Sequence, residues 1–227
     1  MVEHTEPKRR AMNEEQKEER RRIILDVAWR LFAETTYDTV TMLGVAERAG
    51  LAKGTVYLYF RTKEELFLAL EGEQLGAWFD EVDKQLGLVA PTSTDAAIDT
   101  VVRLLGDSLV GRQTLMRLLR ISHTILEQNI DEATALRSKQ VVGARVSHTG
   151  AILETALPFL DPGQGSRLLM QIYALVLGVQ QLADPAPIVK TVVRDHNLVL
   201  FDINFTAEFS DMLRALLLGL AQQSRSE

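Results

Sequence analysis

The sequence predicts an all-α protein with a small N-terminal domain and a larger C-terminal one. Apolar residues recur at three- and four-residue spacing along most of the chain, and no segment alternates with period two for long enough to form a sheet. The prolines lie at position 7 and from position 91 onward, so long helices are permitted between them. The 227 residues include no cysteine, which excludes disulfides, thiol chemistry and thiolate zinc sites.

In the N-terminal third, capping signals divide the helical pattern. Residues 1–13 lack apolar periodicity, and we expect a flexible tail with no fold of its own. Thr41 is a good N-cap, Gly50 supplies a left-handed stop, and Thr62 with Glu65 has the spacing of a capping box. The expected helices cover 14–35, 41–49, 52–60 and 62–86.

The C-terminal part continues as helices. Leu198 to Phe201 has no partner strand, so we expect helix or loop there. The apolar runs are shorter than the roughly 18–20 residues of a membrane span, and the N-terminus lacks a signal-peptide core, so we expect no membrane association and a cytoplasmic protein. The expected helices cover 95–109, 112–129, 131–157, 163–183 and 206–223, and the expected domains are 14–70 and 71–227.

Charge is unevenly distributed. Residues 1–63 hold 12 Lys and Arg against 10 Asp and Glu, whereas the rest of the chain carries a net charge of −8. Phosphates respond to the local field rather than to the total charge. Any nucleic-acid contact is therefore expected in the N-terminal third.

Two short helices joined by the tight Gly50-Leu51-Ala52 turn predict a helix-turn-helix, which projects one helix into a DNA major groove. The run from Val45 to Phe60, followed by Lys63-Glu64-Glu65-Leu66, closely resembles the DNA-binding domain of the TetR/AcrR family of transcriptional regulators. The similarity covers roughly 24–70. It implies double-stranded operator DNA as a partner.

The resemblance also implies which residues contact DNA. Gly54 would let the recognition helix begin near the DNA backbone, and Lys63, in the first turn of the fourth helix, would hold a phosphate. Two alternatives stay open. Lys63 is then a solvated lysine, and Tyr57 and Tyr59 are core residues with their hydroxyls in water. The expected DNA-binding residues are Thr41, Lys53, Gly54, Thr55, Tyr57, Tyr59 and Lys63.

Three features depart from the family pattern. Leu43 and Gly44 stand where polar or basic residues are frequent, so sequence readout is expected to rest on the third helix. Thr36 replaces the glycine that usually closes the first helix, which predicts a weaker or differently built C-cap. The run Lys8-Arg9-Arg10 is either a minor-groove arm or a solvated tail.

For the acidic domain, the resemblance implies a homodimer formed by the last two long helices and a cavity for a small-molecule effector. The alternative for each apolar residue of these helices is the core of its own chain. The candidates are Leu168, Leu169, Ile172, Leu175, Val176 and Val179 in one helix, and Phe209, Met212, Leu213, Leu216, Leu217 and Leu220 in the other. The expected ligand-wall residues are Trp78, Phe79, His123 and Tyr173, with Gln171 or Gln180.

No catalytic or metal site is predicted. His123 and Glu127 share a helix face, but two ligands make a poor metal site, so an ordinary contact between them is favoured. The glycine-rich 161–166 lacks the lysine and strand of a nucleotide loop and indicates a turn into a helix. We therefore expect no cofactor and no enzyme.

The function expected is a ligand-responsive transcriptional repressor that binds its operator as a homodimer and is released by a small molecule. The alternative is a helical protein-interaction scaffold without DNA binding. That alternative leaves Lys53, Thr55, Tyr59 and Lys63 without a role.

Overall fold

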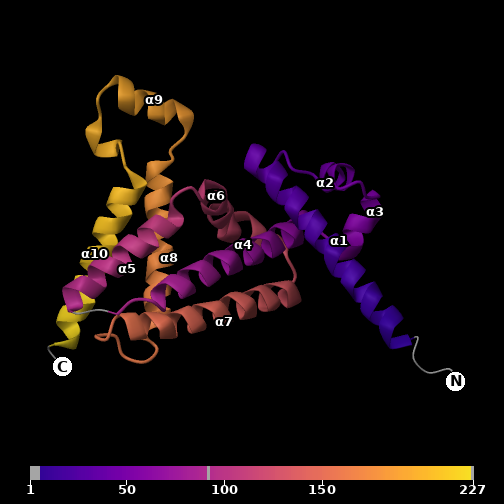
Figure 1. Ribbon diagram of the computed structural model, residues 1–227. Helices are drawn as coiled ribbons and strands as arrows, with labels where there is room; N and C mark the ends of the chain where they lie inside the picture. The colour runs from indigo at the N-terminus through magenta and orange to yellow at the C-terminus, as the bar shows by residue number, and fades with distance from the viewer. Residues whose placement is uncertain (1–5, 91–92, 226–227) are drawn as a thin grey trace. The chain divides into compact units, whose positions relative to one another are not determined.

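The computed structural model describes residues 6–90 and 93–225, with side chains from residue 14 onward. Within these residues the chain is helical and has no strand, which confirms the all-α prediction (Figure 1). The α-helices are α1 (Glu6–Glu34), α2 (Met42–Arg48), α3 (Lys53–Tyr59), α4 (Lys63–Leu86), α5 (Thr94–Leu109), α6 (Gln113–Ile121), α7 (Glu132–Ala156), α8 (Gln164–Ala183), α9 (Pro187–Asp195) and α10 (Phe205–Ser224).

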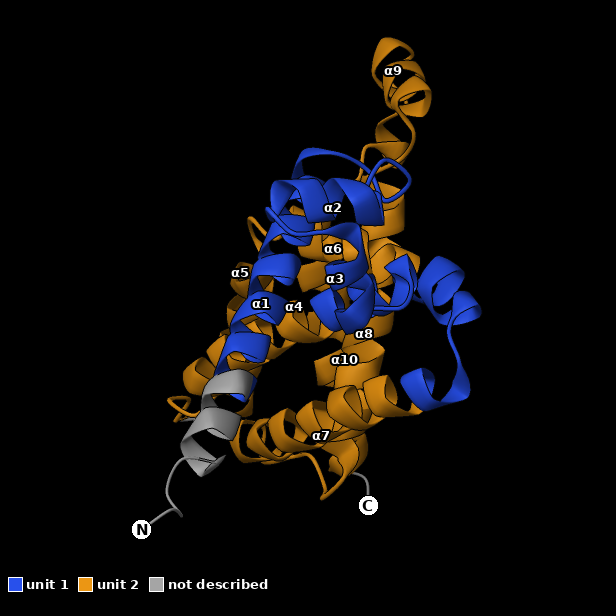
Figure 2. Cartoon of the chain, turned by 90° about the vertical axis from the view of Figure 1, so that its right-hand side faces the viewer, with its two compact units in different colours: residues 1–71, 122–135 blue, residues 72–121, 136–227 orange. Residues whose placement is uncertain are grey.

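The described chain divides into two units, coloured separately in Figure 2. Unit 1 runs to Glu71 and also contains Ser122–Ala135, whereas unit 2 comprises 72–121 and the chain from Leu136 onward. The sequence analysis assigned 122–135 to the C-terminal domain and did not anticipate its return to unit 1. Helix α4 passes from one unit to the other between Glu71 and Gly72 without interruption.

Helix α1 begins at Glu6, earlier than the predicted start at residue 14. Residues 6–13, expected to have no fold, therefore belong to the helix. Proline is tolerated in a first helical turn, and residues 8–34 contain neither glycine nor a further proline. Residues 1–5 and the side chains of Lys8-Arg9-Arg10 lie outside the described part, so a minor-groove contact by this basic run remains a prediction.

The core of unit 1 is aromatic and aliphatic. The ring of Phe67 packs edge-on against Phe32 at 5.3 Å and against Tyr37 at 4.9 Å between centroids. Val45 and Val56 are fully buried, so α2 and α3 turn these valines toward the same core. The short helices are thereby fixed with their other faces outward.

Local caps set the helix ends in unit 1. Gly50 has φ +67°, which confirms the predicted left-handed stop, and its neighbour Leu51 donates a backbone hydrogen bond to Ala46 O at 2.9 Å. At the end of α1, Thr35 Oγ1 donates to Leu31 O at 2.6 Å. Thr35 therefore closes this helix through its side chain. The C-cap is built differently from a glycine cap, as predicted from the threonine at position 36.

The prediction of a single helix over 112–129 is wrong. Helix α6 ends at Ile121, a π-helical turn follows over Ser122–Leu126, and a 3₁₀ turn covers Glu127–Asn129. Ser122 Oγ donates to the buried Glu71 carboxylate at 2.8 Å, and this contact with α4 lies where the regular helix stops.

In unit 2, α10 packs against both α5 and α8, and α7 meets α8 at a close crossing. A Cβ added to Gly165 would lie 2.0 Å from Gly150 O, so only glycine fits there. Glu154 Oε1 accepts hydrogen bonds from the backbone N–H groups of Gly163 at 2.8 Å and Gly165 at 2.9 Å, and thereby caps α8. The predicted turn into a helix at 161–166 is confirmed.

Between α8 and α10 the chain makes an excursion, residues 184–204, that we call the arm. It contains α9, which the sequence analysis missed, and the 3₁₀ turn η3 (Val199–Phe201), where helix or loop was predicted. Figure 1 shows α9 beyond the ends of α8 and α10. Among the described residues no single helix is long and apolar enough to span a membrane; α8 and α9 meet that criterion only as a pair bent by 66°.

Candidate nucleic-acid interface

Helix α3 presents most of the predicted DNA-binding residues. Lys53 and Gly54 are exposed, Tyr57 is 40% exposed, and Val56 on the opposite side is fully buried. Thr55 and Tyr59 are half-buried. The Lys53 ammonium lies 5.7 Å from the centre of the Tyr57 ring, so one face of α3 combines a cation with an aromatic surface.

Leu58 is a residue of this face that the sequence analysis missed. Its side chain is 85% exposed, the largest exposed fraction of any large hydrophobic side chain in the described residues. The available signal was its place between two tyrosines on a helix too short to bury every apolar side chain.

Gly54 has no intramolecular reason to be glycine. A Cβ at this position would meet no atom of the described chain within 4 Å. Glycine inside a helix costs about 0.5–1 kcal/mol relative to alanine. The space beside α3 is therefore open to an approaching molecule.

Thr41 is exposed and caps α2, because its Oγ1 accepts the Gly44 N–H at 3.0 Å. Leu43 on α2 is 48% exposed, whereas Met42 is buried. Helix α2 thus exposes an apolar side chain at Leu43, which accords with the expectation that it makes no polar base contact there.

Lys63 is held by Tyr37, a residue of the loop between α1 and α2 whose role was not predicted from the sequence. The ammonium lies 3.8 Å from the centre of the Tyr37 ring and donates to the Tyr37 carbonyl oxygen. Tyr37 in turn donates its hydroxyl proton to Glu64 Oε1 at 2.6 Å. Lys63 is therefore a positioned, half-buried cation at the start of α4.

The three groups shift one another's pKa values. Burial lowers the pKa of Lys63, although the nearby carboxylates of Asp38 and Glu64 oppose the shift. Burial and the hydrogen bond to Glu64 raise the pKa of Tyr37. Burial also acts to raise the pKa of Glu64, but hydrogen bonds, that from Tyr37 foremost, outweigh it and lower the pKa.

A second ionic cluster attaches the 122–135 segment within unit 1. Arg61 pairs with Glu65 at 2.9 Å and also with Asp131. The Asp131 carboxylate accepts the Thr134 N–H at 2.8 Å, which caps the start of α7. The pKa of Asp131 lies below its usual range because of the bonds from Thr134 and the Arg61 guanidinium.

The capping residue Thr62 works as the sequence predicted, with one difference. Its Oγ1 accepts the Glu65 N–H at 3.1 Å. The Glu65 carboxylate, however, accepts the N–H of Arg61 at 2.8 Å, one residue before the expected partner.

The four predicted ligand-wall residues are dispersed. Trp78 and Phe79 are buried with ring centroids 4.9 Å apart, and Trp78 Nε1 donates to Ser108 Oγ at 3.0 Å. Tyr173 is half-buried on α8. His123 belongs to unit 1, where it is exposed and its Nδ1 lies 3.0 Å from Glu127 Oε2, which confirms the predicted contact.

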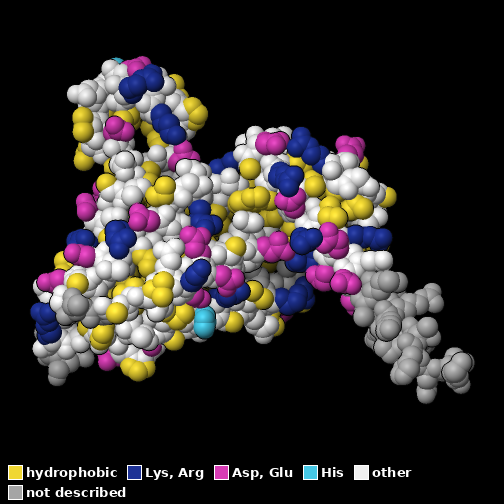
Figure 3. Space-filling model, viewed as in Figure 1, with side chains coloured by type: hydrophobic (Ala, Val, Ile, Leu, Met, Phe, Trp, Pro, Cys, Tyr) yellow, Lys and Arg dark blue, Asp and Glu magenta, His cyan; other side chains and the backbone are white. Residues whose placement is uncertain are grey.

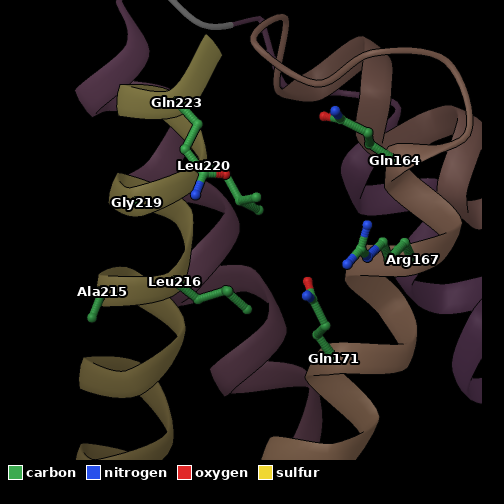
Figure 4. Close-up of a pocket in the computed structure, with 8 residues that line it drawn as sticks. All are labelled: Gln164, Arg167, Gln171, Ala215, Leu216, Gly219, Leu220 and Gln223. Carbon is green, nitrogen blue, oxygen red and sulfur yellow. The ribbon is translucent and has the colours of Figure 1, made fainter. Parts of the chain in front are cut away.

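Among the grooves on the described surface of unit 2, two are lined by none of those four residues. One, of about 430 Å³, lies between the end of α4 and α5. The other, of about 440 Å³, lies between α8 and α10 (Figure 4). Its α8 wall is polar, and its α10 wall is apolar except for Gln223; the lining residues are Gln164, Arg167, Gln171, Ala215, Leu216, Gly219, Leu220 and Gln223.

The apolar residues of α8 and α10 separate into two groups. One group lies in the core of the unit itself: Leu168, Leu169, Ile172, Val176, Val179, Phe209, Leu213 and Leu217. The other stays partly or largely exposed: Leu175, Met212, Leu216 and Leu220. In the described part of the chain, no group of three or more His, Asp or Glu side chains is placed to hold a metal ion.

Known families match almost the whole chain. "Bacterial regulatory proteins, tetR family" matches residues 24–70, and "Tetracyclin repressor-like, C-terminal domain" matches residues 72–224. The chain belongs to the TetR family. The expected resemblance is thereby confirmed, and the helix-turn-helix described above is the DNA-binding motif of this family.

Curated relatives match over part of their length. The chain is 30% identical over 112 residues to the fatty acid metabolism regulator protein of Bacillus subtilis, covering 48% of this chain and 57% of that protein. It is 44% identical over 54 residues to the transcriptional repressor Rv1474c of Mycobacterium tuberculosis, covering 24% and 29% of the two chains.

Solved structures share the fold. The fatty acid degradation regulator FadR of Bacillus halodurans has a TM-score of 0.55 at 22% identity, with 87% of this chain and 97% of that chain covered. FadR of Bacillus subtilis, solved with stearoyl-CoA, has a TM-score of 0.52 at 20% identity, with 86% and 96% covered.

Proposed function

We propose that this chain is a ligand-responsive transcriptional repressor, and no enzyme, that binds operator DNA in the cytoplasm as a homodimer. The observation that carries the proposal is the outward face of α3, which combines Lys53, Gly54, Tyr57 and Leu58 within a tetR-type motif. A protein-interaction scaffold would not require a helical glycine with open space beside it.

We propose that α3 reads bases in the major groove. Thr55 and Tyr59 are half-buried polar groups at its edge, and Leu58 offers an apolar contact suited to a thymine methyl group. Leu58→Ala should therefore relax discrimination at an A·T position, whereas a phosphate contact would affect all sequences alike.

Phosphates are bound by the cations around α3. Lys63 is fixed over Tyr37 and stands at the start of α4, where the positive end of the helix dipole also favours an anion. Thr41 and Lys53 stand at the other helix starts. Lys63→Ala should weaken binding to all duplexes about equally and reduce the slope of log affinity against log salt by about 1.

A dimer is needed because one recognition helix covers only a few base pairs. The α8–α10 groove supports the pairing of two copies: Ala215 and Gly219 leave room for a helix to approach, and Leu216 and Leu220 remain to be buried. Two copies would place two α3 helices roughly 34–36 Å apart.

The effector is proposed to bind unit 2 and to act through α4 and the 122–135 segment. Helix α4 belongs to unit 1 up to Glu71 and to unit 2 beyond it, and the 122–135 segment belongs to unit 1, where Ser122 binds Glu71 and Asp131 binds Arg61. A coupling of about 1–3 kcal/mol is typical of such systems. Trp78, Phe79, His123 and Tyr173 remain proposed ligand contacts, and stearoyl-CoA, with which one structural relative was solved, is the first effector to test.

The deciding experiment is fluorescence anisotropy of the purified protein on DNA from upstream of its own gene. Specific binding should be far tighter than binding to a shuffled duplex and should fall about a thousandfold between roughly 50 and 200 mM salt. Stearoyl-CoA and free coenzyme A are then added in parallel. Equal, weak binding to both duplexes would refute the proposed operator recognition.

A further inference from the structure

The arm between α8 and α10 carries an apolar surface that its own unit does not cover. Four of its side chains are largely exposed: Ile188 at 69%, Val199 at 71%, Leu200 at 81% and Phe201 at 59%. Figure 3 shows hydrophobic side chains at the outside of this projection. Such a cluster is unusual for surface that stays in water.

The arm has a built conformation. Leu198 N donates to Val193 O at 2.9 Å, and Asn197, at φ +50°, turns the chain from α9 back toward η3. At the base, Asp184 pairs with Lys190 at 2.7 Å and with Arg120 at 3.2 Å. The apolar surface is therefore presented by a formed hairpin-like element with an anchored root.

We propose that the arm is a second dimerisation element, which packs its apolar side onto the other copy of this chain. The proposal rests on the proposed homodimer and extends it beyond the α8–α10 groove. The arm begins where α8 ends and returns to the start of α10, whereas the groove is lined by the start of α8 and the end of α10. The groove and the arm would therefore be two separate contacts along the same pair of helices.

The exposed area supports a second copy as the occupant. A standard interface buries about 800 Å² per partner, of which roughly 500 Å² is apolar. The exposed fractions of the four arm residues add up to about three whole side chains, which is on the order of 500 Å² of exposed apolar surface. The most exposed large apolar residues of α8 and α10 amount to only about two side chains, on the order of 300 Å²; they are Met170, Leu182, Met212 and Leu218.

The charges of the arm argue against a membrane. A helix that binds an anionic lipid surface presents a row of basic residues. On the arm, Lys190 is paired with Asp184, and Arg194 is paired with Asp195 at 3.0 Å. Asp202 adds a further negative charge, so the arm offers no cationic face.

The cysteine-free sequence allows a direct test by alkylation. Leu200→Cys and the control Leu88→Cys introduce single thiols at positions of matched exposure, 81% and 79%. Each is reacted with N-ethylmaleimide at protein concentrations below and above the dimer midpoint found by sedimentation. We expect the Leu200→Cys rate to fall about tenfold or more on dimerisation, and the Leu88→Cys rate to stay constant.

The outcomes separate the two proposals. A wild-type chain that stays monomeric overturns the homodimer and the arm contact together. A dimer in which Leu200→Cys keeps its monomer rate overturns the arm contact alone. Wild-type binding to phosphatidylcholine–phosphatidylglycerol vesicles that is lost in Leu200→Ser would replace the second copy by a lipid surface.

A second measurement uses the dimer dissociation constant. Leu200→Ser with Phe201→Ser should raise it about tenfold or more, whereas Leu88→Ser should leave it unchanged. Because Leu200 and Phe201 are exposed in the single chain, the melting temperature of the monomer, measured below the dimer midpoint, should not fall in the double variant. An unchanged dissociation constant counts against the arm contact.

Discussion

At the proposed DNA-binding face, Lys63 is held by a residue distant in sequence. Lys63 is fixed by Tyr37, 26 residues away, through a cation–π contact and a carbonyl hydrogen bond. Gly54, in contrast, has open space around it. One residue is thus restrained from within the chain, and the other leaves room for a partner.

Gly54→Ala should have opposite effects on folding and binding. Alanine lowers the unfolded-state entropy and favours helix, so the free energy of unfolding should rise by about 0.5–1 kcal/mol. The added methyl should obstruct the DNA backbone and weaken affinity. Urea denaturation and anisotropy check the two signs, and unchanged affinity would show that no close approach occurs at this residue.

At the scale of elements, local signals were sufficient for most helix ends. Gly50 and Thr62 act where the sequence places them, because capping involves residues at most five positions apart. The break in 112–129 was not predictable, since Glu71, which binds Ser122, is 51 residues away. Helix α9 was missed although Pro187 in its first turn is a start signal.

The candidate site was predictable to a similar extent. The motif around Lys53 to Tyr59 identified the reading helix, but Leu58 and Tyr37 escaped notice because their importance depends on exposure and on tertiary contact. The ligand-wall residues were chosen by side-chain type, and they stay a prediction: Trp78 is buried, and side-chain type alone does not place it at a cavity.

The α7–α8 crossing allows a paired test of packing. Gly150→Ala places a Cβ 2.6 Å from Ser166 N, so the free energy of unfolding should fall by about 2 kcal/mol or more. Gly143→Ala, one heptad earlier on α7, meets nothing within 4 Å and should raise it by about 0.5–1 kcal/mol. Denaturant titration of both variants is the measurement; equal effects would contradict the close crossing.

The attachment of the 122–135 segment should depend on pH. The folded-state pKa of Asp131 is below its unfolded value of about 3.9, so its stabilisation is fully present above that pH and is lost as the pH falls through the folded-state value. Asp131→Asn should flatten the loss of stability between about pH 5 and 2. Thermal melts across this range, with Asp195→Asn as the control, provide the comparison.

At the scale of the whole molecule, the proposed function depends on two copies acting together. Ala215→Arg places a charge in the α8–α10 groove and should shift the protein toward monomer in sedimentation. Affinity for a full operator should fall to that for a half-site. Ala151→Arg, at an exposed alanine on α7, is the matched control. Dimerisation that survives Ala215→Arg would place the interface elsewhere.

The division of unit 1 into two stretches of chain has a consequence for building hybrid regulators. Gly72 offers a convenient junction, because the two family matches meet there and a side chain at this position would touch nothing. Yet Glu71 and Arg61 need Ser122 and Asp131 as partners. A graft at Gly72 alone would separate these pairs. A working hybrid therefore has to take residues 122–135 from the same parent that supplies the N-terminal part of unit 1, up to Glu71.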